Sequence, residues 1–393
     1  MDRERVRPAS STPWWRRAER WLRTGFATQV VQSARTCAGI SEPVQYTGRM
    51  HGRFGAGKAS LLAAALAACS SSGTRSGSSG GGAPVPADTP CATPSGVTTL
   101  FPDYAYTIAL HGGNAYLATI KGVLQVPIAG GPATALASGG EAFTLTLDAK
   151  DAYYVSSHPA GAANAEGKVS STTALYQVPL AGGASQILVD GAWGTIMATD
   201  GTWLWWGGSQ LQGVRLGQST PVPIRFPLEA GALVEAIAVG SDSLFLAVYA
   251  ITSGGPGVGS IRRAKKDGSS VTTIVAGLQH PTAVGLDDDA VYYNDDGSPS
   301  GIIGRADLDG SGQTTLVKVA TQSLVVDAHA VYFVTADAIQ RVPKTGGSVE
   351  TIVDGLKTPG NLALDGGNVY WVDGTSVALS DPNPGYAVMT TCK

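Results

Sequence analysis

The stretches DGGNVYWVD at residues 365–373, DDDAVYYND at 287–295 and DAHAVYFVT at 327–335 share one pattern. Each begins with Asp, passes through a short polar or small turn, and continues into an apolar run with a central aromatic residue. Asp readily bonds the backbone that follows it and is typical of turns, whereas aromatic and β-branched residues favour strands. Each stretch therefore predicts a tight turn followed by a buried β-strand.

The same pattern recurs along the chain from about residue 100 to residue 380. Its central aromatic residues are Tyr116, Tyr153, Trp205, Phe245, Tyr292, Tyr332 and Tyr370, and successive ones lie 37 to 52 residues apart. Repeats of about 40 residues that contain several short strands are typical of β-propellers. The sequence therefore predicts an all-β fold, a β-propeller of about seven four-stranded blades spanning residues 97–393.

Turn signals separate the strands within these repeats. Three repeats carry Val-Pro at the end of the strand that follows the aromatic one, and Gly-Gly comes three residues later, at Gly130, Gly182 and Gly346. A single blade exposes two apolar faces, which only neighbouring blades can cover. We therefore expect the central aromatic residues to pack between blades. The repeated Asp residues are expected to form turns, and the acidic run 287–289 to be a solvated turn.

Two of the aromatic strands resemble a known family. The segments Tyr370-Trp371-Val372-Asp373 and Tyr292-Tyr293-Asn294-Asp295 are similar to the repeats of YWTD-type propellers, and the segment 304–312 resembles the turn that follows them in that family. The resemblance implies a propeller that binds other proteins on one face and offers no shared catalytic residues. It also implies six blades, which is the alternative to the seven anchors counted in this chain.

The N-terminal region has the features of a bacterial export signal. Residues 59–68 read ASLLAAALAA, an apolar run preceded by Arg53 and Lys58, and Leu66-Ala67-Ala68-Cys69 resembles a lipobox. A basic segment followed by a short apolar run is typical of a signal peptide and is too short to span a bilayer stably. Residues 50–69 are thus expected to be a lipoprotein signal peptide with Cys69 lipidated; the alternative is a buried Ala-rich helix with an ordinary cysteine.

The residues on either side of this signal are interpreted accordingly. Residues 1–49 precede a possible start at Met50 and are expected to be a spurious or disordered extension. Residues 70–96 are rich in Ser, Gly and Pro, a composition that cannot bury a core. They are expected to form a flexible tether that holds the propeller away from a membrane. The predicted location is the bacterial cell envelope, with a lipid anchor, or the secreted fraction.

Two cysteines remain once the lipobox and the extension are set aside. Cys91 and Cys392 lie at opposite ends of the predicted propeller, whose chain ends meet in the closing blade. In an oxidising compartment a disulfide between them would lock the ring. Two cysteines alone are too few ligands for a zinc site, so no metal site is predicted from them.

Charge is distributed unevenly along the chain. Residues 1–69 hold 11 Lys and Arg against 4 Asp and Glu, whereas residues 70–393 hold 16 against 26, a net charge of −10. An acidic body repels phosphate backbones, so nucleic acid is excluded as a partner. We expect a monomer whose partner is a protein or glycan of the envelope.

Candidate functional residues follow from the order of strands in a propeller. Residues placed before or near the inner strands can surround the mouth of the central channel. They are Glu141, His158, Trp193, Glu235, His280, Gln322 and Lys357. The two widest spacings between anchors also predict long loops on this face, at 158–173 and 250–259. Long loops on a rigid scaffold commonly carry binding.

The chain shows weak signs of catalysis or cofactor binding. Its histidines are spread over different repeats without metal-ligand spacing, and the predicted propeller, residues 97–393, contains no Gly-x-Ser-x-Gly nucleophile elbow. The segment Asp307-Leu308-Asp309-Gly310-Ser311-Gly312 imitates the start of a calcium loop but lacks the later acidic ligand, so a turn is expected there. The sequence predicts a non-catalytic binding propeller without cofactor. The alternative is a calcium-dependent hydrolase or lyase with a site at the channel mouth.

Overall fold

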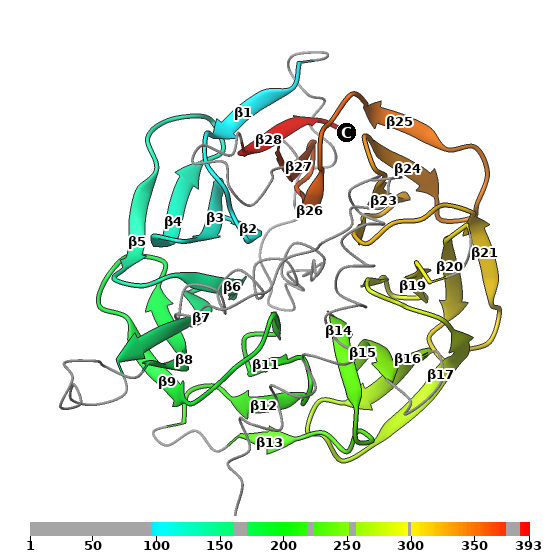
Figure 1. Cartoon of the computed structure of the whole chain (residues 1–393), viewed down its shortest axis with the longest axis horizontal. Coiled ribbons are helices and arrows are strands. Elements are labelled where there is room, and N and C mark those ends of the chain that lie inside the picture. The colour runs from blue at the N-terminus through cyan, green and yellow to red at the C-terminus, as the bar shows by residue number, and fades with distance from the viewer. Residues whose placement is uncertain (1–95, 160–170, 219–222, 251–256, 298–299, 375–385) are drawn as a thin grey trace, which may run out of the picture. The chain divides into compact units, whose positions relative to one another are not determined.

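The structure is a computed structural model that describes residues 96–159, 171–218, 223–250, 257–297, 300–374 and 386–393. These residues form 28 β-strands and no helix. The strands make seven antiparallel sheets of four strands each, which stand around a central axis as the blades of a propeller (Figure 1). The predicted all-β propeller of seven four-stranded blades is confirmed, and the alternative of six blades is wrong.

Several predicted segments lie outside the described residues. They are the extension 1–49, the signal peptide 50–69 with Cys69, the tether 70–96 except for its last residue, and Cys91. Most of the two predicted long loops falls there as well, in 160–170 and 251–256. Since the described ranges contain only strands and their connections, they hold no apolar helix of membrane-spanning length.

Six blades are each built from four consecutive strands, listed here from the inner strand outward. Blade I contains β2 (Thr107–His111), β3 (Asn114–Thr119), β4 (Gly122–Pro127) and β5 (Thr134–Ser138). Blade II contains β6 (Ala142–Leu147), β7 (Asp151–Pro159), β8 (Ser171–Pro179) and β9 (Gln186–Asp190). Blade III contains β10 (Ile196–Thr199), β11 (Trp203–Gly207), β12 (Gln212–Arg215) and β13 (Ile224–Arg225).

The next three blades repeat this order. Blade IV contains β14 (Ala232–Val239), β15 (Ser243–Ala250), β16 (Val258–Lys265) and β17 (Val271–Leu278). Blade V contains β18 (Val284–Leu286), β19 (Ala290–Asp295), β20 (Ile302–Asp307) and β21 (Thr314–Val317). Blade VI contains β22 (Leu324–Val326), β23 (Ala330–Val334), β24 (Ile339–Pro343) and β25 (Glu350–Val353). The inner strand of each blade contacts the inner strands of its neighbours around the whole ring.

Blade VII combines strands from opposite ends of the propeller sequence. Its inner strands are β26 (Gly360–Leu364), β27 (Asn368–Asp373) and β28 (Ala387–Cys392), and its outer strand is β1 (Thr98–Phe101). β1 pairs antiparallel with β28 and places Thr98 opposite Thr390, 292 residues later (Figure 1). Backbone hydrogen bonds between the first and last strands therefore close the ring.

The second strand of each blade carries the packing between blades. All six residues of β19 are buried, and each of the seven aromatic anchors is at most 3% exposed. Tyr153 of blade II, for example, packs in one cluster with Met197 and Trp206 of blade III. Fully burying a side chain of this size contributes about 1.5–3 kcal/mol. The anchors are packing residues between blades, as their periodic recurrence predicts.

The Asp residues that begin the repeats form turns between the first and second strands. In each of five such turns one carboxylate oxygen accepts hydrogen bonds from the backbone N–H groups two and three residues ahead, at 2.7–2.9 Å. The five residues are Asp148, Asp200, Asp287, Asp327 and Asp365. This bonding fixes the turn and confirms the predicted role of these residues.

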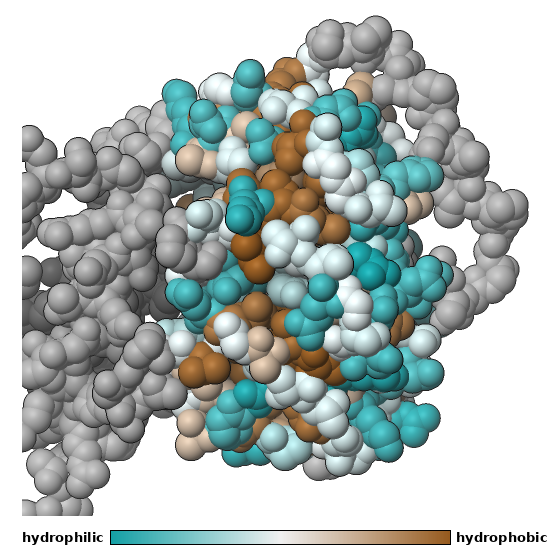
Figure 2. Space-filling model, turned by 90° about the vertical axis from the view of Figure 1, so that its right-hand side faces the viewer, coloured by the Kyte–Doolittle hydropathy of each residue, from teal (hydrophilic) through white to brown (hydrophobic). Residues whose placement is uncertain are grey.

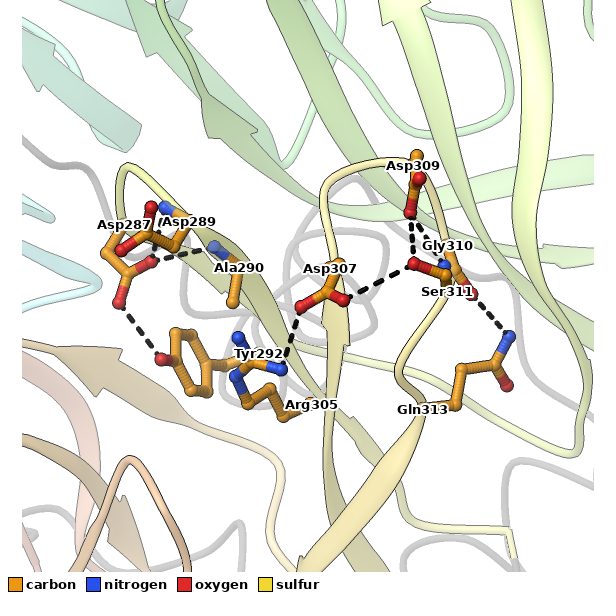
Figure 3. A network of polar contacts seen from close by, with 10 residues as sticks. All are labelled: Asp287, Asp289, Ala290, Tyr292, Arg305, Asp307, Asp309, Gly310, Ser311 and Gln313. Carbon is orange, nitrogen blue, oxygen red and sulfur yellow. Dashed lines mark hydrogen bonds and ion pairs between the residues drawn. The ribbon is translucent and has the colours of Figure 1, made fainter.

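Asp287 differs from the solvated turn residue that its sequence context predicts. Its second oxygen accepts a hydrogen bond from the Tyr292 hydroxyl at 2.9 Å (Figure 3) and pairs with Lys344 Nζ of blade VI at 2.8 Å. Burial alone would raise the pKa of Asp287, but the ammonium of Lys344 and the donated backbone hydrogen bonds lower it to about 2. The carboxylate thus links two blades, a role that a local sequence pattern does not reveal.

The outer strands form the rim of the propeller. β21 and β25 each begin with two exposed residues and end with two half-buried ones. The half-buried Leu316 and Val317 pack on the core between blades V and VI. Figure 2 looks onto this side of the molecule and shows apolar side chains among polar ones. Such a mixture is ordinary for a solvent-facing surface.

Candidate binding site on the loop face

The two ends of the ring are built differently. At one end, the turn face, lie the turns between the first and second strands and between the third and fourth strands of each blade. At the other end, the loop face, lie the links between second and third strands and the connections that join one blade to the next. The joining connections are 102–106, 139–141, 191–195, 226–231, 279–283, 318–323 and 354–359.

The seven candidate residues all lie toward the loop face. Five of them belong to connections between blades, namely Glu141, Trp193, His280, Gln322 and Lys357. His158 lies near the end of β7, and Glu235 lies inside β14 rather than ahead of it, which corrects the position that the sequence predicts. Among the seven, His280 acts electrostatically on Glu235, while the others contact neighbours outside the set.

Trp193 is the largest exposed side chain on this face, with 51% of its surface exposed. Its ring lies 5.9 Å from that of Phe143, tilted by 58°. Phe143 is the extra residue of a β-bulge, because Ala142 and Thr144 pair with the adjacent Ser156 and Val155. Bulges re-aim side chains and are frequent beside functional sites.

Glu141 lies directly before β6, one blade boundary away from Trp193. Its Oε1 accepts a short hydrogen bond from the hydroxyl of Tyr106, a residue that precedes blade I. Burial, the bond to Glu141 and its negative charge all raise the pKa of Tyr106, so this hydroxyl stays protonated and donates. Tyr104 extends the group, with ring centroids 5.0 Å from Tyr106 and 4.7 Å from Tyr386.

Glu235 and His280 form a second group, between blades IV and V. Glu235 is the extra residue of another bulge, which lies between Val234 and Ala236 of the inner strand. Burial raises the pKa of Glu235, and the positive charge that His280 can carry opposes this rise. The His280 ring stands edge-on to Tyr249 at 4.7 Å.

The remaining candidates contact structural partners. His158 Nε2 lies 3.0 Å from Asp190 Oδ1, and this hydrogen bond lowers the pKa of Asp190. Gln322 Nε2 donates to Asp296 Oδ2 at 2.9 Å, and the backbone N–H of Lys357 donates to Asp373 Oδ1 at 3.0 Å. These contacts hold the connections between blades in place.

Sequence reasoning missed the aromatic residues around Glu141 and Trp193. Tyr104 and Tyr106 precede the first repeat, and Phe143 looks like an ordinary residue of an inner strand. The bulge that positions Phe143 depends on pairing with β7 and has no local signature. The close spacing of Tyr104 and Tyr106 is the sequence feature that could have indicated this aromatic group.

The part of the chain that the structure describes contains no group of three or more His, Cys, Asp or Glu residues able to hold a metal ion. The segment that imitates a calcium loop is a turn: Gly310 N donates to Asp307 O at 2.8 Å, and Ser311 bonds both Asp307 and Asp309 (Figure 3). Arg305 also pairs with Asp307 Oδ1 at 2.9 Å. The carboxylates of this segment are engaged by the protein itself.

Comparisons with known proteins relate this chain by fold alone. No protein-family model matches the sequence, and no curated protein matches it. Among solved structures, the extracellular domain of a putative hybrid two-component system from B. thetaiotaomicron gives a TM-score of 0.53 at 12% identity, covering 75% of this chain and 39% of that one. A puromycin-hydrolyzing peptidase from Mycobacterium tuberculosis gives 0.50 at 16% identity, covering 70% and 51%.

A nidogen/laminin complex also matches, with a TM-score of 0.41 at 18% identity, covering 51% of this chain and 82% of that one. The matched region spans about half the length of the peptidase chain and about two fifths of the two-component chain. The similar structures include a peptidase as well as an extracellular domain, so the shared fold is compatible with either kind of function. What the comparisons and the topology together show is a seven-bladed β-propeller.

Proposed function

We propose that this protein is a non-catalytic binding protein of the bacterial cell envelope, and that its loop face binds a protein or glycan partner. The observation that carries the proposal is the contrast between the two ends of the ring. On the turn face, repeated carboxylates are engaged in turns and in ion pairs between blades. On the loop face, Ile120, Trp193 and Val258 expose between 51% and 58% of their surfaces. The exposed apolar residues toward the turn face, Val97, Ile187 and Val349, expose less, between 38% and 48%.

Exposed large apolar groups on a rigid scaffold mark interaction surfaces when they gather on one face. The lipobox-like sequence that ends at Cys69 supports this location, and the Ser/Gly/Pro segment after it would hold the propeller away from a membrane. The extracellular domain with a similar fold is consistent with such a location. The acidic body favours a partner that is neutral or basic.

A second candidate function rests on Glu235 and His280. On the loop face, a carboxyl whose pKa is raised by burial and an imidazole that acts on it electrostatically would provide the parts of a general acid–base pair. In that case the protein would be a hydrolase or lyase, with calcium as the cofactor that the sequence suggests as an alternative. Substitution of either residue would then abolish turnover without weakening partner binding.

The test uses the full-length chain with Cys69→Ser, so that a lipid cannot retain it on membranes. One variant replaces Ile120, Trp193 and Val258 by Ser on the loop face. The matched control replaces the exposed Lys150, Asp242 and Asp309 by Ser on the turn face. We expect co-sedimentation with purified envelopes to fall at least fivefold for the loop-face variant alone. Equal binding by both variants would contradict the proposal.

A further inference from the structure

Trp193 is exposed, yet the loop that carries it is held rigidly. Its neighbour Ala192 is 3% exposed, and Gly194 on its other side is buried. A Cβ atom on Gly194 would lie 2.6 Å from the carbonyl oxygen of Gly207, and Thr195 N donates to that oxygen at 3.0 Å. The indole is therefore presented on a fixed backbone, and ordering it on binding costs little conformational entropy.

Phe143, which contacts Trp193, and Glu141, which contacts Tyr106, lie two residues apart in the chain. They flank Ala142 at the start of β6, so their Cα atoms are at most about 7 Å apart. Two groups that originate in different blades thus become neighbours at this strand.

Glu141 keeps part of its hydrogen-bonding capacity unused. Its Oε1 accepts from Tyr106, while its Oε2 makes no hydrogen bond among the described residues. A carboxylate oxygen can accept two hydrogen bonds, and an ionised carboxylate only accepts. The site thus offers an aromatic face and an acceptor of hydroxyl groups, held in place from two sides.

We propose that Trp193, Phe143, Glu141 and Tyr106 form a binding site for a neutral glycan. This inference rests on the proposed function of the loop face and names the partner class. A pyranose ring presents an apolar C–H face that stacks on an indole, and its hydroxyls donate to a carboxylate. Sites of mostly aromatic surface with a few placed polar groups are typical of small-ligand recognition. The net charge of −10 on residues 70–393 and the Glu141 carboxylate both oppose an anionic polysaccharide.

The experiment is a calorimetric titration of the full-length Cys69→Ser chain with neutral hexasaccharides of glucose, galactose, mannose or N-acetylglucosamine. We expect at least one to bind. Trp193→Ala should weaken binding at least tenfold and Glu141→Gln at least threefold, while Trp193→Phe should retain part of the affinity. Ile187→Ala, at an exposed position of β9 in blade II and outside the loop-face set, is the matched control and should bind as the parent does. Thermal melts verify that each variant is folded.

The outcomes separate this inference from the proposed function. If none of the four hexasaccharides binds, but the loop-face variant still loses envelope binding, the glycan assignment is wrong and the partner is a protein. If a hexasaccharide binds equally well to Trp193→Ala, the site is misplaced. If the parent binds neither envelopes nor hexasaccharides, the proposed function fails together with the inference.

Discussion

At the scale of single residues, the turn face shows how neighbouring blades are joined. Lys266, Lys344 and Lys393 each follow the third strand of one blade and pair with an Asp of the preceding blade at 2.8 Å. The side chains of these pairs are 12–20% exposed. Asp148 and Asp365 begin the corresponding turns of blades II and VII. The blades that follow them, III and I, have Leu216 and Ile128 where the three ion pairs have a lysine. Three of the junctions on this face thus carry an ion pair, and two others have an aliphatic residue at the position of the lysine.

Lys393 provides the most direct test of these junctions. Lys393→Met removes one partner of a partly buried pair and leaves Asp327 with its charge, so we expect the free energy of unfolding to fall by about 2 kcal/mol. That value lies between those of exposed and buried pairs. Chemical denaturation measures it, with Lys150→Met, at an exposed position of the same face, as the control. Equal effects of the two substitutions would mean that the pair contributes nothing.

The same carboxylates predict how stability depends on pH. Burial opposes ionisation of Asp327, but its bonds to Lys393 and to two backbone N–H groups lower the pKa to about 2, as for Asp287. A pKa below the unfolded value means stabilisation above pH 4 that is lost as the pH falls toward 2, by about 2 kcal/mol per carboxylate. Denaturation between pH 5 and 2.5 should show this loss.

The variant Asp287→Asn/Asp327→Asn checks the assignment of that pH dependence. It should be less stable at pH 7 and lose much less stability between pH 4 and 2.5 than the parent. Asp242→Asn, at an exposed turn position, should retain the parental slope. If the double variant keeps the full slope, other groups are responsible for it.

The sequence predicted the residues of this face but not their pairing. A turn is local: Asp287 bonds to N–H groups two and three residues ahead, so its identity and position are enough. The pair Asp327–Lys393 joins residues 66 positions apart, and nothing around either residue indicates the other. This is why Asp287 is predicted to be solvated and is found bonded to Lys344 instead.

At the scale of strands, bulges determine what the loop face presents. The inner strands β6, β14 and β26 each contain an irregularity near their start, beside Phe143, at Glu235 and around Asn361. Asn361 adopts a positive φ of 51° and donates to Tyr106 O at 2.9 Å. Strand periodicity predicts the existence of these strands. It cannot predict the bulges, because an extra residue is defined only by the register with the neighbouring strand.

The close approach of Gly194 to blade III is testable with a pair of glycines. Gly194→Ala places a methyl group 2.6 Å from Gly207 O, which forces a backbone shift that costs about 1–3 kcal/mol. Gly208→Ala meets its nearest atom, Thr195 Oγ1, at 3.9 Å and should change stability by less than about 0.5 kcal/mol. Thermal melts of both variants compare the stability that each substitution removes. Similar values would show that the loop yields easily.

At the scale of the whole molecule, seven repeats of one pattern were enough to predict the architecture. Each aromatic anchor lies in the second strand of its own blade, so counting the anchors counted the blades. The segment from Trp205 to Phe245 resembles the YWTD pattern least, yet blades III and IV have the same strand order as the others. Burial between blades tolerates Trp, Phe or Tyr at the anchor, and a family motif is more restrictive than that physical requirement.

The predicted disulfide acts on the ring as a whole. The register of β1 with β28 pairs Thr98 with Thr390, so the start of β1 lies near Cys392, and Cys91 precedes Thr98 by seven residues in the sequence. The described residues do not include Cys91, and the bond stays a prediction. Peptide mapping without reductant should recover the two cysteines linked, and reduction should lower the free energy of unfolding by up to about 5 kcal/mol. The Cys392→Ser variant should have the same melting temperature with and without reductant.

The closing blade also sets an order of events during synthesis. β1 leaves the ribosome first among the strands of the propeller and β28 last, and 292 residues separate Thr98 from Thr390. At about 5–20 residues per second, β1 waits on the order of 15–60 s for its partner. It is only four residues long and begins with two exposed threonines, so it is a poor template for aggregation in that interval. The last blade therefore cannot close before the final strand is available to β1, wherever the chain folds.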